Sequence, residues 1–133
     1  MKQLLIAYFS TLLSMLAIDG IWLGTMMNRF YKPRMGELLA KNPSYAPAIV
    51  FYLLYTFGVL FLVVQPALKN ASPLWQTFLY GALLGMVAYG TYDLTNQATL
   101  KSWPTSLTVV DLIWGSLLTG TVAVLAVVVA RWF

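Results

Sequence analysis

Four long runs of apolar residues, separated by shorter polar stretches, divide this chain. They cover residues 4–24, 46–65, 74–98 and 105–131. A helix needs about 20 apolar residues to cross the hydrocarbon core of a bilayer, and each run has that length. The pattern therefore predicts an all-α integral membrane protein, a bundle of four transmembrane helices that forms a single domain over residues 1–133.

Prolines mark the expected ends of these helices. Pro66 is expected to end the second helix, and Pro73 and Pro104 to open the third and fourth. The connections at 66–73 and 99–104 are short, so the second and third helices and the third and fourth are expected to be antiparallel neighbours. The whole chain is then a multi-pass protein whose two termini lie on the same side of the membrane.

The connection at residues 25–43 is longer and is expected to be a loop, in which residues 34–40, after Pro33, could form one or two turns of interfacial helix. Together with the 99–104 connection it carries five of the eight basic residues, which favours a cytoplasmic position for both loops and an outside position for both termini. These five residues are Arg29, Lys32, Arg34, Lys41 and Lys101.

Composition narrows the chemistry. With 60% hydrophobic and 9% charged residues, a soluble domain of this size would expose too much apolar surface. Cysteine and histidine are both missing, which excludes disulfides, thiol chemistry, Cys/His zinc sites and haem ligation through these residues. The basic residues flank apolar runs, so the expected partner is the lipid bilayer and not a nucleic acid.

Three of the four carboxylates lie inside apolar runs: Asp19, Asp93 and Asp111. An ionised Asp near the bilayer centre costs about 2.5–3.5 kcal/mol on insertion scales, so such residues are expected to face each other or a wet cavity. At a rise of 1.5 Å per residue, Asp19 lies about 7 Å and Asp93 about 10 Å past the middle of its helix. With Asp111 just inside the fourth helix, all three are predicted to share one layer near one membrane face.

Residues spaced four apart extend this layer along the third helix. Gly81 and Gly85 continue into Tyr89, Asp93 and Gln97 on one face. The two glycines would let another helix approach closely, and a homodimer could use them. We predict an acidic ligand-binding pocket and assign no catalytic residue. Its expected residues are the anionic Asp19, Asp93 and Asp111, the hydrogen-bonding Tyr52, Tyr89, Tyr92, Asn96 and Gln97, and the aromatic Trp22 and Trp114.

Such a pocket predicts binding or transport of a cation, a proton or a small basic or polar ligand. Crowded carboxylates cannot all ionise, so binding would release protons. A hard divalent cation also suits oxygen ligands, with Asp19, Asp93 and Asp111 as its expected ligands. Two alternatives stay open. The aspartates could hold helices together in a structural or accessory subunit, or they could serve an intramembrane enzyme that acts on a lipid headgroup.

Several local motifs are more specific than the overall pattern. The sequence carries DGIWLG at 19–24, FYK at 30–32, YGTYDLTNQATL at 89–100, WP at 103–104 and DLIWG at 111–115. With these motifs the chain resembles, over essentially its whole length, the bacterial membrane proteins catalogued as domain of unknown function 2177. The resemblance implies a small four-helix protein of the bacterial inner membrane, and it implies no activity.

Overall fold

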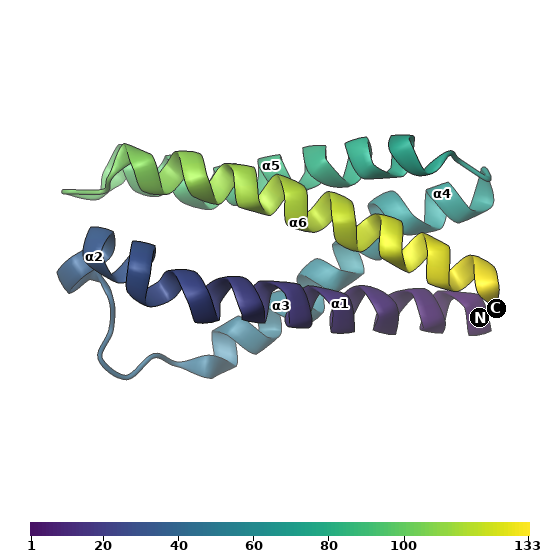
Figure 1. Cartoon of the computed structure of the whole chain (residues 1–133), viewed down its shortest axis with the longest axis horizontal. Coiled ribbons are helices and arrows are strands. Elements are labelled where there is room, and N and C mark those ends of the chain that lie inside the picture. The colour runs from purple at the N-terminus through teal and green to yellow at the C-terminus, as the bar shows by residue number, and fades with distance from the viewer.

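The protein is entirely helical, and its long helical segments run back and forth between two ends (Figure 1). The computed structural model describes residues 1–133. Two helices, α5 (Leu74–Thr99) and α6 (Thr105–Trp132), confirm the third and fourth predicted helices almost to the residue. The first and second predicted helices are α1 (Lys2–Met26) and α3 (Tyr45–Val59), and both continue further than expected.

The predicted loop after the first helix is wrong over much of its length. The helix begun by α1 continues as a π-helical turn, η1 (Met27–Tyr31), then as α2 (Lys32–Met35) and a short 3-10 turn, η2 (Gly36–Leu38). Only residues 39–44 separate it from α3. Most basic residues of this stretch therefore lie on a helix.

The prediction that Pro66 ends the second helix is also wrong. After α3 the chain passes through a π-helical turn, η3 (Leu60–Val64), into α4 (Gln65–Lys69), and the helix ends only there. The connection to α5 is correspondingly shorter than expected.

A widened turn carries the helix past a proline at both places. In η1 the backbone N–H of Lys32 donates to the carbonyl of Met27, five residues earlier, and Pro33 follows directly. A proline ring collides with the carbonyl four residues earlier in a regular α-helix, and the wider π turn relieves that collision. The same arrangement in η3 precedes Pro66. The missing N–H of each proline then falls in the first turn of the next α-helical segment, where it costs little.

The central helix is α6, which contacts both α5 and α1. Glycines permit the close approach of α5. A Cβ on Gly81 would lie 2.9 Å from the Cα of Gly120, and one on Gly85 would lie 2.8 Å from the carbonyl carbon of Gly115. The expected close approach of a helix to this stripe is confirmed, but the helix belongs to the same chain. The two glycines are therefore not open to a second copy, and a homodimer, which stays a prediction, would need another surface.

Three helical segments are long and apolar enough to cross a membrane: Lys2–Leu38, Tyr45–Lys69 and Thr105–Trp132. The segments also expose many large apolar side chains to their surroundings, including Phe9, Leu54 and Ile113. The protein is thus embedded in a membrane. The mean hydropathy of α5 is too low for it to be counted with these three segments, because Gly, Thr, Tyr and Gln lie among its apolar residues.

Two apolar clusters occupy different levels of the bundle. The larger one extends to the end of the bundle where both termini lie (Figure 1). At that end the Gln3 side-chain amide donates to the carbonyl of Ala130 over 3.3 Å. The smaller cluster contains Tyr31, Trp103 and Leu107 and lies near the opposite end. Asp19, Asp93 and Asp111 lie between these clusters.

Candidate functional site

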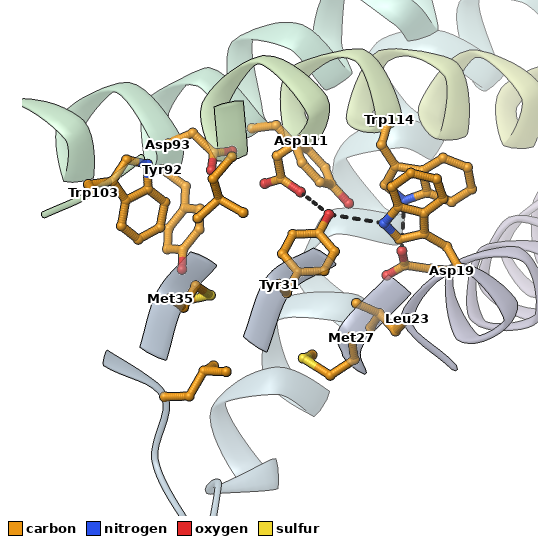
Figure 2. Close-up of a pocket in the computed structure, with 14 residues that line it drawn as sticks. Asp19, Leu23, Met27, Tyr31, Met35, Tyr92, Asp93, Trp103, Asp111 and Trp114 are labelled. Atoms are coloured by element: carbon orange, nitrogen blue, oxygen red, sulfur yellow. Dashed lines mark hydrogen bonds between the residues drawn. The ribbon is translucent and has the colours of Figure 1, made fainter. Parts of the chain in front are cut away.

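A cavity of about 240 Å³ lies between the extension of the first helix and the helices α5 and α6 (Figure 2). It is enclosed by the end of α1, by η1 and α2, by the end of α5 and by the beginning of α6. All three aspartates predicted for the pocket contribute to its wall. The residues that line it are Asp19, Trp22, Leu23, Met27, Tyr31, Met35, Leu39, Tyr89, Tyr92, Asp93, Trp103, Leu107, Asp111 and Trp114.

Asp19 has hydrogen-bond partners on both of its carboxylate oxygens. The Tyr52 hydroxyl of α3 donates to Oδ2, and the Trp114 Nε1–H of α6 donates to Oδ1 over 2.9 Å. Because Asp19 itself belongs to α1, one carboxylate joins three helices. A buried carboxylate whose two oxygens each accept a hydrogen bond from another helix is well suited to stabilise the bundle.

A chain of aromatic contacts leads from Asp19 to Asp111. The ring of Trp22 stacks on that of Trp114, with centroids 4.1 Å apart. The Nε1–H of Trp22 donates to the Tyr31 hydroxyl over 3.0 Å, and this hydroxyl donates to Asp111 Oδ1 over 2.7 Å (Figure 2). Tyr31 thus fixes Asp111 from the far side of the cavity.

Asp93 differs from the other two aspartates. It is fully buried, and neither of its carboxylate oxygens has a hydrogen-bond partner within the protein. Its carboxyl group lies close to that of Asp111, and the two interact electrostatically (Figure 2). A buried polar group without a partner costs free energy, and such groups are rare in folded proteins. Asp93 is therefore the carboxyl group most in need of an external partner.

Aromatic rings make up much of the remaining wall. Three tryptophans and three tyrosines line the cavity, and Trp103 is held by donating its Nε1–H to Thr108 Oγ1 over 3.0 Å. The faces of such rings attract cations, including alkylammonium groups. The combination of carboxyl groups with aromatic faces suits an organic cation. The six aromatic residues are Trp22, Trp103, Trp114, Tyr31, Tyr89 and Tyr92.

The hypothesis of a shared metal site is not supported by the geometry. No three acidic side chains of the chain lie close enough together to hold a metal ion. Both oxygens of Asp19 accept hydrogen bonds from Tyr52 and Trp114, and Figure 2 shows Asp19 and Asp93 at opposite ends of the cavity. The three carboxylates share a cavity but not a coordination sphere.

The residues of this cavity lie within a segment that a known family covers. A family model described as predicted membrane protein (DUF2177) matches residues 4–128. The chain belongs to the DUF2177 family. No curated protein and no solved structure matches it. The family resemblance expected from the sequence motifs is confirmed. The matched residues include most of all four long helical segments and all three aspartates of the DUF2177 protein.

In this DUF2177 protein, seven of the ten residues predicted for the pocket line the cavity: Asp19, Asp93, Asp111, Tyr89, Tyr92, Trp22 and Trp114. Tyr52 lies behind Asp19 as its hydrogen-bond donor. Asn96 and Gln97 do not line the cavity, and the Gln97 amide donates instead to Thr105 Oγ1 over 3.0 Å, between α5 and α6. The role of each residue in ligand binding stays a prediction.

The prediction missed the side of the cavity that the extended first helix supplies. Leu23, Met27, Tyr31, Met35 and Leu39 recur every four residues and line the cavity together. That spacing is the periodicity of one helical face and is visible in the sequence. The expected loop at 25–43 concealed it, because the first helix was predicted to end at residue 24.

Proposed function

We propose that this membrane protein binds a small organic cation, with its ammonium group between Asp93 and Asp111. The observation that carries the proposal is the buried Asp93, whose two carboxyl oxygens have no partner within the protein. An ammonium group would donate hydrogen bonds to these oxygens and offset the electrostatic repulsion between the neighbouring carboxyl groups. The surrounding aromatic faces add a further attraction.

The alternative of a purely structural role is supported for Asp19 only. Its oxygens are both used in contacts between helices, as a structural residue requires. The Asp93 carboxyl group accepts no hydrogen bond from an N–H or hydroxyl group of another helix, and it faces the carboxyl group of Asp111 instead. The proposal is limited to binding, because a partnerless carboxyl group explains affinity for a cation and not its passage across the membrane.

In this proposal α5 is the fourth transmembrane helix. With 26 residues it is about 39 Å long, more than the hydrocarbon core requires. It packs against α6, which does qualify as a span, and it exposes Leu79, Leu83 and Val87 on its other side. The lower hydropathy of α5 then reflects its buried glycines and the polar residues near the cavity. The bacterial inner membrane remains the predicted location, on the strength of the sequence motifs alone.

Thermal unfolding of the detergent-purified protein tests the proposed binding. We expect ethylammonium and related amines to raise the unfolding temperature of the wild type, because a ligand stabilises the state that it binds. Asp93→Asn is expected to weaken amine binding about 10- to 100-fold, the worth of one charge-assisted hydrogen bond. Sodium, magnesium and calcium at the same ionic strength serve as the comparison for non-specific charge effects.

Glu37→Gln is the matched control for this substitution. It removes the same charge from an exposed residue outside the cavity, and the amine response is expected to remain. An amine effect that is equally large in Asp93→Asn and in the wild type would refute the proposed site.

A further inference from the structure

A second hollow opens on the side of the bundle next to the acidic cavity. It is a groove of about 680 Å³ between α3 and α5. Its wall is mostly apolar, and α3 supplies Pro47, Ala48 and Phe51, all of them exposed. The α3 wall belongs to Tyr45–Lys69, a segment long and apolar enough to cross a membrane, so within a bilayer this groove would open toward lipid.

The groove exists because α3 diverges from α5. The second helical segment meets α5 mainly through η3, while α3 leads away from α5 toward its own beginning (Figure 1). Small side chains then leave the space between the helices unfilled: Ala48 on one wall and Ala88 on the other.

The groove and the acidic cavity share part of their walls. Tyr89, Tyr92 and Asp111 line both hollows. An apolar surface that opens to the bilayer therefore ends at a carboxyl group, and the partnerless Asp93 lies just beyond it. Neither a hydrocarbon chain nor a small hydrophilic cation matches both parts of this surface.

We propose that the ligand is an amphiphilic amine that enters from the bilayer. Its ammonium group lies between Asp93 and Asp111, and its alkyl chain lies in the groove formed by Ala48, Phe51 and Tyr92. This inference rests on the proposed function and specifies its substrate class. Charge complementarity selects a basic headgroup, because the carboxyl groups around the cavity repel an anionic phosphate. The apolar groove selects a long chain, because burial of each methylene adds affinity.

The alkyl chain and the ammonium headgroup can be tested separately with two ligands and two variants in which an alanine is replaced by phenylalanine. The ligands are ethylammonium and dodecylammonium, and binding to the full-length protein in lipid nanodiscs is followed by the fluorescence of the tryptophans that line the cavity. Ala48→Phe fills the groove. Ala46→Phe is the matched control, because Ala46 is exposed on the same turn of α3 and does not line the groove.

We expect Ala48→Phe to weaken dodecylammonium binding about tenfold, through loss of chain burial, and to leave ethylammonium binding unchanged. Ala46→Phe is expected to change neither affinity. Because each variant is compared with the wild type in the same nanodiscs, the partition of the long-chain amine into lipid cancels.

The other outcomes overturn the inference in distinguishable ways. If Ala48→Phe leaves dodecylammonium binding intact, or weakens both amines equally, the chain does not lie in the groove, while ethylammonium binding that depends on Asp93 would still support the proposed function. If neither amine binds the wild type, the proposed function fails together with the inference.

Discussion

Replacing Gly85 with alanine is expected to destabilise the folded protein by about 3 kcal/mol or more, at the upper end of the range for overpacked cores. The added Cβ would lie 2.8 Å from the carbonyl carbon of Gly115 and 2.7 Å from Thr119 Oγ1. The nearest atom of all is the carbonyl oxygen of Gly115, which belongs to the backbone of α6 and cannot rotate away as a flexible side chain could. The two helices would have to separate, and the contacts between them would weaken together. Thermal unfolding in detergent, followed by circular dichroism, measures the effect.

Gly58→Ala is the control for this substitution. Gly58 lies within α3, and a Cβ there would meet no atom within 4 Å. Alanine is the better helix former, so stability is expected to stay unchanged or to rise slightly. Equal stability of the two alanine variants would show that α5 does not pack on α6 through Gly85.

Asp19→Ala and Asp93→Ala are expected to have opposite effects on stability. Loss of the Asp19 carboxylate leaves the Tyr52 hydroxyl and the Trp114 Nε1–H without their acceptor. Since hydrogen bonds to a charged group contribute about 1.5–3 kcal/mol each, a loss of about 3 kcal/mol or more is expected. Asp93→Ala removes a buried carboxyl group that accepts no hydrogen bond from an N–H or hydroxyl group and that lies beside the carboxyl group of Asp111, so stability without ligand is expected to stay the same or to increase.

Asp19→Asn refines the comparison. The amide oxygen can accept from Trp114, and the amide N–H can donate to the Tyr52 hydroxyl oxygen, so this variant is expected to retain most of the stability that Asp19→Ala loses. Unfolding temperatures of the three variants in the absence of amines measure these differences. If Asp93→Ala proved as destabilising as Asp19→Ala, both aspartates would be structural, and the proposed site would lose its basis.

Much of the fold follows from local sequence. Apolar runs of membrane-spanning length predicted the four helical segments, and the prolines at positions 73 and 104 marked the starts of α5 and α6 correctly. Pro66 does not end the second helix, and the reason is physical. A proline ends a regular helix but not one whose preceding turn has widened to the π form, and whether a turn widens depends on what the continued helix gains by packing.

The candidate site shows the same division between local and tertiary information. Helical depth brought Asp19, Asp93 and Asp111 to one level, since rise per residue is a local property, and the structure gathers them around one cavity. Their different environments could not be read from spacing. Which carboxyl oxygens find donors depends on Tyr52 and Trp114, residues distant in the sequence that only packing brings to Asp19.

The sequence by itself determined that this is a helical membrane protein, that it belongs to the DUF2177 family, and that three aspartates lie at one depth. These properties depend on composition, on the period of the helix and on short motifs, all of which are local. The tertiary structure decided that α6 of the same chain covers Gly81 and Gly85. It decided that both carboxylate oxygens of Asp19 accept hydrogen bonds, and that those of Asp93 accept none. It also decided that a mostly apolar groove between α3 and α5 ends at Asp111. Each of these depends on which helices touch and at what angle, and that is settled by the packing of side chains far apart in the chain.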